Sequence, residues 1–250
     1  MKRFTLGHPA TSYTAVVARF ITTPRSLSEV LASTWMFESF AEKELDNIAA
    51  LAVRRTFGAR KHIVQKGDPG DGLFVLLRGR AKVTSANLEG GGTAFNIMGA
   101  GEVFGEVALL DSGLRSATVT AIDDCETAFI HKDAFRALLL DNPRIGVQLL
   151  ELLSRRLRQL TERVEDRAFL AVKARLAKQI VRLADDHGGP LDGGGIRIPL
   201  AISQQDLGSL VDATRESVNK QLRSWTRSGV LRHDRRQLDV YDMDALRACV

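Results

Sequence analysis

The sequence predicts an α+β fold in three parts: an N-terminal antiparallel β-roll, one long dimerisation helix and a C-terminal winged helix-turn-helix. Three features of the 250-residue chain favour this fold. Short runs of strand-forming residues alternate with glycine-rich turns in the first half, and a narrow stripe of leucines with helical spacing follows them. Closer to the C-terminus, two apolar helical patterns flank a tight turn, which is typical of a helix-turn-helix.

The composition is that of an ordinary globular protein, with 44% hydrophobic and 26% charged residues. The net charge of +5 favours an anionic partner. Cys125 and Cys249 are too few for a disulfide framework or for a cysteine-only zinc or iron–sulfur site. We therefore expect reduced thiols, no bound metal and a cytoplasmic location. No segment reaches the length of a membrane span, and residues 1–24 are expected to form a poorly ordered extension.

The β-roll is expected to occupy residues 25–143. A short helix begins near Ser39, where Ser39–Glu42 forms a capping-box pattern ahead of an apolar face. Short strands bounded by glycine-rich turns favour a small barrel or double-sheet roll over a parallel sheet. The candidate strands are His62–Val64, Leu73–Leu77, Ala81–Thr84, Thr93–Ile97, Ala117–Thr120 and Thr127–Ile130.

A long helix is predicted from Pro143 to about Asp166, and it supplies the middle part of the chain, residues 144–167. Its apolar residues recur alternately three and four positions apart, and arginines flank them. A narrow apolar seam with charged shoulders is typical of a helix that pairs with a second copy of itself. The alternative is that the stripe packs on the β-roll of its own chain. The seam residues are Leu150, Leu153, Leu157, Leu160 and Val164.

The last part, residues 168–250, is expected to form the winged helix-turn-helix. Ser203 and Asp206 have the spacing of a capping box at the start of the first helix. Asp212 tolerates the left-handed backbone of a tight turn, and Thr214 suits the N-cap of the second helix. These signals predict two helices joined by a short turn.

The second helix of such a motif places its N-terminal residues in the DNA major groove. Arginine and lysine donate to guanine, and glutamate accepts from the cytosine amino group. A carboxylate among cations is unsuited to phosphate binding alone and suits base reading; the alternative is a solvated helix face of mixed charge. The predicted DNA-binding residues are Arg215, Glu216, Asn219, Lys220 and Arg223, and a hairpin with Arg232, Arg235 and Arg236 suits a wing.

The stretch Phe104–Val119 combines groups that suit a ribose phosphate. Gly105 allows a close backbone approach, and the Glu106 carboxylate beside it suits sugar hydroxyls. Arg115 and Ser116 supply a bidentate cation and a hydroxyl for a phosphate. From these residues alone, a buried Glu–Arg salt bridge in a turn is the alternative.

This stretch resembles the phosphate-binding cassette of cyclic-nucleotide-binding domains. From about Ser39 to Tyr241, the chain resembles the catabolite-activator and FNR-type transcription regulators. Besides the cassette, the resemblance is carried by Gly67-Asp68, Leu73-Phe74, Gly79, Arg155–Leu157, Ala168–Leu170 and Thr214–Val218. It implies a homodimer that binds palindromic double-stranded DNA under the control of a cyclic nucleotide, cAMP or cGMP. RNA polymerase is a further implied partner, and no membrane is involved.

The resemblance also implies roles for individual residues. These are Gly105 and Glu106 at the ribose, Arg115, Ser116 and Ala117 at the cyclic phosphate, Phe95 and Met98 on the pocket wall, and Arg215, Glu216 and Lys220 at the bases of DNA. Close family members have arginine where this chain has Lys220, and we expect a TGTGA-like half-site. In cyclic-AMP receptor proteins, adjacent Thr and Ser contact the adenine. Thr161 keeps the second hydroxyl but Leu160 cannot hydrogen-bond, so the choice between cAMP and cGMP stays open.

Other functions fit the sequence less well. An enzyme lacks support because the sequence offers no nucleophile–base pair and no metal cluster. FNR-type oxygen sensing needs an N-terminal cysteine cluster, and haem binding needs an axial ligand such as His62 or His131. A kinase-type regulatory subunit shares only the nucleotide domain and lacks the helix-turn-helix. The remaining alternative is a ligand-independent regulator, or a sensor of another ligand, that uses the β-roll as a dimerisation scaffold.

Overall fold

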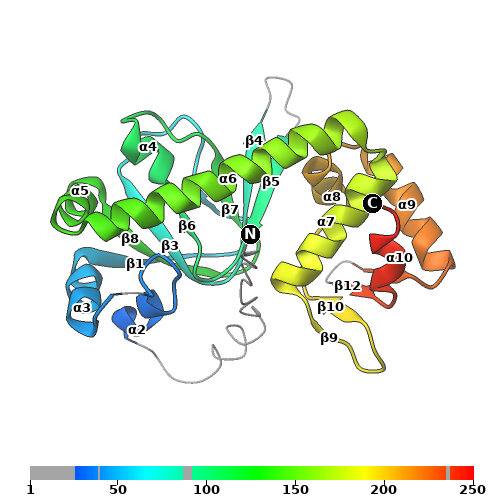
Figure 1. The fold of residues 1–250 in the computed structure, drawn as a ribbon, viewed down its shortest axis with the longest axis horizontal. Coiled ribbons are helices and arrows are strands. Elements are labelled where there is room, and N and C mark those ends of the chain that lie inside the picture. The colour runs from blue at the N-terminus through cyan, green and yellow to red at the C-terminus, as the bar shows by residue number, and fades with distance from the viewer. Residues whose placement is uncertain (1–25, 39, 87–91, 235–236) are drawn as a thin grey trace, which may run out of the picture.

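The computed structural model describes residues 26–38, 40–86, 92–234 and 237–250. It confirms the α+β fold: a β-roll, the long helix α6 (Pro143–Phe169) and a C-terminal helical domain with a small sheet (Figure 1). The predicted extension, residues 1–24, lies outside the described residues. None of the described helices is long and apolar enough to cross a bilayer.

The β-roll consists of two four-stranded sheets in which neighbouring strands are antiparallel. The first has the order β1 (Ala52–Phe57), β8 (Cys125–His131), β3 (Gly72–Arg78), β6 (Val103–Phe104). The second has the order β2 (His62–Val64), β7 (Thr118–Ala121), β4 (Ala81–Ala86), β5 (Gly92–Met98). All six predicted strands are present, whereas β1 and β6 were not predicted.

Central strand β3 explains how the roll is filled, because its side chains alternate between two cores. Phe74 packs between the sheets, with its ring centroid 5.1 Å from that of Phe104 and 4.9 Å from that of Phe129. Leu73 and Val75 point the other way, into a second core. That core is covered by α2 (Leu27–Ala32), α3 (Glu42–Leu51), α5 (Lys132–Asp141) and the first half of α6.

Two helix starts show how local capping acts in this chain. The predicted Ser39–Glu42 capping box is wrong, because α3 begins at Glu42 and the extended Ala41 is its N-cap. The Ala41 backbone N–H donates to the Glu44 carboxylate at 2.8 Å, and Ser39 itself lies outside the described residues. Helix α6 has Pro143 at its first position, as predicted, and it continues three residues beyond Asp166 to Phe169.

In the described residues, the C-terminal domain packs four helices against one antiparallel sheet. Its helices are α7 (Val172–His187), α8 (Gln204–Leu210), α9 (Arg215–Arg227) and α10 (Met243–Arg247). The sheet has the order β11 (Leu231–His233), β12 (Leu238–Val240), β10 (Ile196–Ile198), β9 (Gly189–Pro190). The hairpin β11–β12 occupies the position of a wing, and the predicted wing residues Arg235 and Arg236 lie outside the described residues.

The C-terminal domain is docked on strands β4 and β5 of the roll. Ile97 of β5 is buried in the same apolar cluster as the core of the C-terminal domain. The Lys82 ammonium lies 2.8 Å from the Asp206 carboxylate, and the Arg80 guanidinium donates to the Pro199 carbonyl. Burial acts to raise the pKa of Asp206, but hydrogen bonds from Lys82 and Ser203 outweigh it and lower that pKa. The interface therefore combines an apolar contact with one ion pair.

We expect His187 to make this interface sensitive to acid. It ends α7 beside Gly99 of the roll, and burial together with the charge of Arg80 lowers its pKa to about 4. When the pKa of a histidine is lower in the folded state, its contribution to stability is complete at pH values above its unfolded-state pKa of 6.5. This contribution is lost as the pH falls toward the folded-state pKa of about 4. The upper bound of the loss is about 3 kcal/mol.

We therefore expect the unfolding free energy of His187→Gln to fall less than that of the wild type between pH 6.5 and pH 4.5. Urea unfolding at both pH values measures this difference. Burial raises the pKa of nearby Glu102 to about 7, so both proteins share that second titration and their difference isolates His187. Equal pH profiles would contradict the assignment.

Candidate functional site

A cavity of about 430 Å³ lies between the Phe104–Val119 stretch and α6. This volume is within the range of small-ligand pockets. It opens where two sheets, the short helix α4 (Glu106–Leu110) and the long helix meet. The predicted ligand residues that line it are Gly105, Glu106, Arg115, Ser116, Ala117 and Met98.

Gly105 has the left-handed φ of +88° and precedes α4. A Cβ built there would lie 2.5 Å from Nη1 of Arg115 and 3.1 Å from the Gly72 carbonyl oxygen. A side chain is therefore excluded both by backbone strain and by the lack of space. The glycine lets the guanidinium of Arg115 lie against the backbone at the cavity wall.

Glu106 is the buried carboxylate of the cavity, with only 1% of its surface exposed. One oxygen pairs with the Arg156 guanidinium of α6, which also donates to the Val103 carbonyl at 2.6 Å. The second oxygen, Oε2, is buried and has no hydrogen-bond partner among the described residues. A buried acceptor of this kind is costly unless a donor reaches it, and a ligand hydroxyl is such a donor.

Arg115 is 3% exposed and is held by three contacts. Its Nη1 donates to the Gly105 carbonyl at 3.0 Å, and its Nη2 lies 2.7 Å from the Asp71 carboxylate. Its guanidinium carbon lies 5.6 Å from the centroid of the Phe74 ring. The side chain of Asp71 is 55% exposed, so a phosphate that reaches Arg115 competes with a solvated carboxylate. Beside it, the exposed Ser116 lines the same cavity.

Another predicted ligand residue, Thr161, is placed differently. Thr161 does not line the cavity of its own chain; it is exposed, and its hydroxyl donates to the Leu157 carbonyl at 3.0 Å. Phe95 belongs to β5, but its side chain lies outside the described residues. The histidines considered for haem, His62 and His131, do not line the cavity.

Several cavity residues were missed as ligand-binding candidates: Asn96, Leu153, Arg156, Leu157, Gln159, Leu160 and Arg163. The three leucines among them were assigned to the dimer seam. The pair Arg155-Arg156 was visible in the sequence, but nothing local indicates that Arg156 reaches Glu106, 50 positions away. Positions 153, 156, 157, 160 and 163 share one helix face by their spacing, and this periodicity is the signal that could have found them.

The helix-turn-helix is capped as predicted. The Ser203 hydroxyl accepts from the Asp206 N–H at 3.0 Å, and Thr214 accepts from the Ser217 N–H at 3.2 Å. Asp212 in the turn has the left-handed φ of +50°. Gly208 permits the close crossing of the helices, because a Cβ there would lie 2.6 Å from the Ala213 carbonyl oxygen.

Helix α9 buries one face and exposes the other. Val218, Leu222 and Trp225 are its buried residues. The predicted DNA-binding residues Arg215, Glu216, Lys220 and Arg223 are exposed, and Asn219 is half-buried with its amide oxygen 3.5 Å from Nε2 of Gln204. The predicted DNA-binding residues on the exposed face thus combine three cations with one carboxylate, which is suited to the edges of base pairs.

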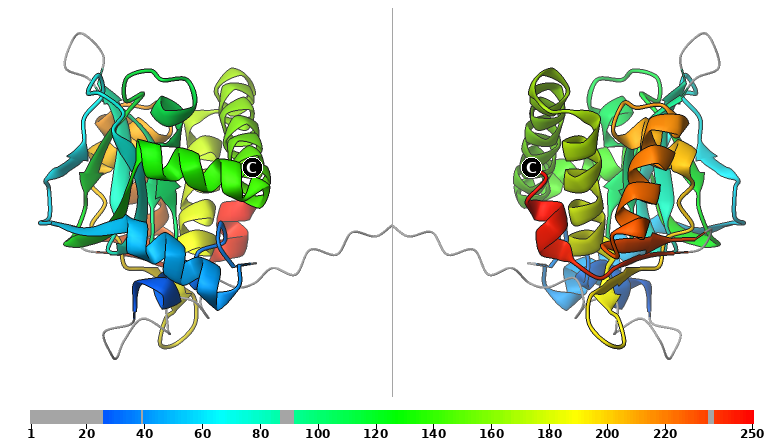
Figure 2. Two further views of the ribbon diagram at one scale, coloured as in Figure 1. Left: turned by 90° about the vertical axis from the view of Figure 1, so that its left-hand side faces the viewer. Right: turned by 90° about the vertical axis from the view of Figure 1, so that its right-hand side faces the viewer.

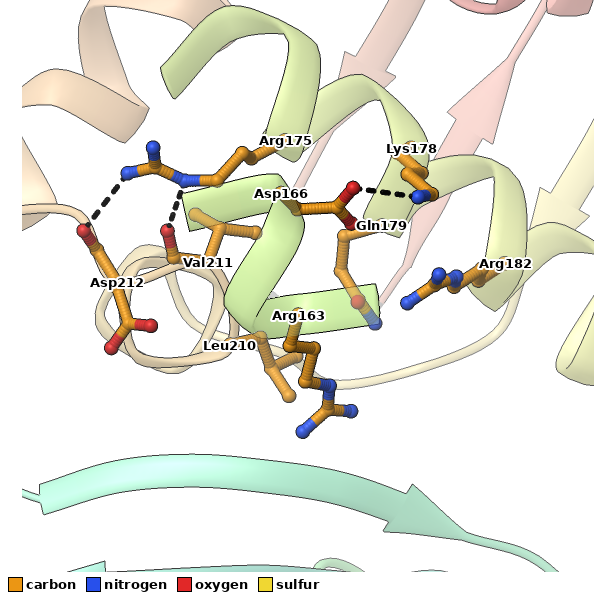
Figure 3. A pocket seen from close by; sticks show the side chains of 9 residues that line it. All are labelled: Arg163, Asp166, Arg175, Lys178, Gln179, Arg182, Leu210, Val211 and Asp212. Atoms are coloured by element: carbon orange, nitrogen blue, oxygen red, sulfur yellow. Dashed lines mark hydrogen bonds and ion pairs between the residues drawn. The ribbon is translucent and has the colours of Figure 1, made fainter. Parts of the chain in front are cut away.

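A cluster of charged residues connects α6 and α7 to the turn of the helix-turn-helix (Figure 3). Arg175 donates to the carbonyls of Leu170, at the end of α6, and of Val211 and Asp212, in the turn. Lys178 lies 2.7 Å from Asp166, and Arg182 lies 2.6 Å from Glu162. Figure 2 shows the two helices side by side at this junction. The position of the turn is therefore tied to the long helix.

The predicted seam is largely exposed in the single chain. Leu150, Leu157, Leu160 and Val164 have exposed fractions of 66%, 65%, 49% and 70%, whereas Leu153 is half-buried beside the cavity. The residues of α6 that pack on the β-roll are instead Ile145, Leu149 and Leu152. The stripe therefore does not serve the core of its own chain.

Comparison with known proteins identifies the family. A model of the cyclic nucleotide-binding domain matches residues 54–142, and a model of the Crp-like helix-turn-helix domain matches residues 174–249. The CRP-like cAMP-activated global transcriptional regulator of Mycobacterium tuberculosis is 30% identical over 220 residues, covering 88% of this chain and 98% of that protein. The chain belongs to the CRP/FNR family of transcription regulators.

Other CRP/FNR proteins are similar over most of their length. The cyclic AMP receptor protein of Thermus thermophilus is 29% identical over 197 residues, or 79% of this chain and 88% of that protein. The solved structure of the c-di-GMP-responsive regulator CLP of Xanthomonas campestris matches with a TM-score of 0.71 and 24% identity, over 80% of this chain and 99% of that one. As a CRP/FNR-family member, this chain is a DNA-binding transcription regulator with a cyclic-nucleotide-binding domain.

Proposed function

We propose that this regulator acts in the cytoplasm as a homodimer that binds a palindromic operator under the allosteric control of a purine cyclic nucleotide. RNA polymerase is the proposed partner of the DNA-bound dimer. In this proposal, Arg215, Glu216, Asn219 and Lys220 read base edges, and Arg223 contacts phosphate. The operator half-sites are met by two recognition helices about 34 Å apart.

The buried Glu106 carboxylate is the main observation that supports the proposed ligand. Its unpartnered Oε2 lies in the cavity that Arg115 and Ser116 also line. A ribose 2′-hydroxyl supplies the missing donor, and a cyclic phosphate accepts from the guanidinium and the hydroxyl. Gly105 lets the Arg115 guanidinium lie against the backbone at the cavity wall. One ligand with a hydroxyl next to a phosphate satisfies all of these groups.

The coupling to DNA follows from the position of α6. Its residues line the cavity, its exposed seam is the proposed dimer contact, and its C-terminal half is tied through Arg175 to the turn before α9. A ligand that favours one arrangement of the paired helices therefore favours one placement of the recognition helices. Thr161, exposed on α6, is proposed to meet the ligand of the partner subunit across this seam.

Calorimetric titration of the full-length protein with cAMP and with cGMP tests the proposed ligand. Saturable binding of at least one nucleotide is expected. If neither nucleotide binds, the proposal for the ligand is wrong, and the β-roll acts as a dimerisation scaffold or senses a different ligand. The DNA-binding assignment does not depend on this titration.

A further inference from the structure

One polar group of the cavity wall is buried without a partner in the described part of the chain and is not used by the ribose-phosphate contacts. Arg163 of α6 lines the same cavity as Glu106 and Arg115, and its Nε is buried without a hydrogen-bond partner among the described residues. Burial and the charge of neighbouring Arg182 lower the pKa of its guanidinium. A buried donor without an acceptor is unfavourable, so a ligand that brings an acceptor is favoured there.

The other donors near Arg163 are already paired. Arg156 pairs with Glu106, Lys178 with Asp166, and Arg182 with Glu162. Figure 3 shows the Arg163 guanidinium on the far side of the charged cluster from Arg175 and Lys178. Arg163 is thus directed away from the ion pairs of α6 and α7.

The remaining polar residues of the cavity wall do not distinguish the two purines. Asn96 and Gln159 have amides that both donate and accept, so they serve adenine and guanine alike. Leu160 has no hydrogen-bonding group for the adenine 6-amino group. Arg163 is different because a guanidinium only donates. Guanine presents two acceptors, O6 and N7, on one edge, whereas adenine presents one acceptor and one donor there.

We propose that Arg163 selects the base of the effector by donating to O6 and N7 of guanine, so that the effector is cGMP rather than cAMP. This inference rests on the proposed function of the cavity. Adenine would place its 6-amino donor against the guanidinium and would find no acceptor on Leu160. A bidentate arginine–guanine pair discriminates between bases by about 5- to 150-fold.

Titrations with cGMP, cyclic IMP and cAMP at one ionic strength test the selection. Cyclic IMP keeps O6 and N7 and lacks the 2-amino group of guanine. We expect cGMP and cyclic IMP to bind with similar affinity, both at least about fivefold tighter than cAMP. Tight binding of cGMP alone would assign selection to a group that reads the 2-amino position, and it would overturn the role of Arg163.

Arg163→Gln supplies the decisive comparison, because glutamine both donates and accepts. The preference for cGMP over cAMP is expected to fall to about threefold or less, while cAMP affinity stays within about threefold of the wild type. Retained cAMP binding also shows that the variant is folded. Arg158→Gln removes the same charge from an exposed position of α6 outside the cavity, and its preference should be that of the wild type.

Failure of the inference and failure of the proposed function give different results. If cAMP binds as tightly as cGMP or more tightly, the cavity is a nucleotide site and the assignment of Arg163 is wrong. An unchanged preference in Arg163→Gln leads to the same conclusion. If no cyclic nucleotide binds, the proposed function of the cavity fails and the inference fails with it.

Discussion

Arg115→Ala is expected to abolish the binding of cyclic nucleotide, with an affinity loss of at least about 100-fold. The guanidinium is 3% exposed and is the charged donor proposed for the cyclic phosphate. Its loss leaves the phosphate in a low-dielectric cavity without a bidentate partner, and breaking a buried charge pair costs about 3–5 kcal/mol. Calorimetric titration with the nucleotide that binds the wild type measures the effect.

Two further variants separate this role from a general loss of stability. Arg115→Lys keeps the charge but loses the planar fork, so it should recover only part of the affinity. Arg136→Ala removes an arginine from an exposed position of α5 and should bind as the wild type does. Wild-type affinity in Arg115→Ala would show that the cavity does not bind phosphate in the proposed way.

Val164→Asp is expected to convert the dimer into monomers and to weaken operator binding by at least about 100-fold. Val164 is 70% exposed in the single chain and lies on the proposed seam without lining the cavity. In a symmetric pair, two aspartates would meet in an apolar contact, where desolvation and mutual repulsion both oppose association. A monomer meets only one half-site at a time and loses the advantage of joint binding.

Analytical ultracentrifugation and fluorescence anisotropy with a palindromic DNA measure the two effects. Leu150→Asp, at the other end of the seam, should behave in the same way. Leu140→Asp is the matched control, because Leu140 is 76% exposed on α5 and does not belong to the seam. Dimers of unchanged stability in both seam variants would contradict the assignment of the seam as the dimer contact.

The helix-turn-helix could be predicted from the sequence because its signals are local. The Ser203 capping box, the left-handed Asp212 and the Thr214 cap each depend on residues within three positions of one another. The spacing of Val218, Leu222 and Trp225 likewise shows the buried face of one helix.

The missed strands lack such signals. Strand β6 has only two residues, and β1 includes two adjacent arginines and follows α3 without a turn. Strand β1 pairs with β8, residue Ala52 lying opposite Ile130, so the contact that makes it a strand is distant in the sequence. Pairings of this kind are determined by tertiary structure and have weak local propensity.

The sequence predicted most residues of the candidate site but not the side chains with which they pair. The cassette residues Gly105, Glu106, Arg115 and Ser116 stand within one short stretch, which made them visible together. The structure adds their partners, which come from other elements: Asp71 for Arg115, and Arg156 for Glu106. The Arg163 Nε is buried without a partner in the described part of the chain because α6, α7 and the end of α8 meet there. Spacing along one helix cannot reveal such a contact between elements.

In the proposed mechanism, nucleotide binding in the roll changes the affinity of the dimer for DNA. Its most direct test is fluorescence anisotropy with an operator selected from random sequences, without nucleotide and with a saturating concentration of the one that binds. We expect an affinity difference of about 5- to 150-fold, corresponding to about 1–3 kcal/mol of coupling. Equal affinity in both conditions, with the nucleotide shown to be bound, would contradict it.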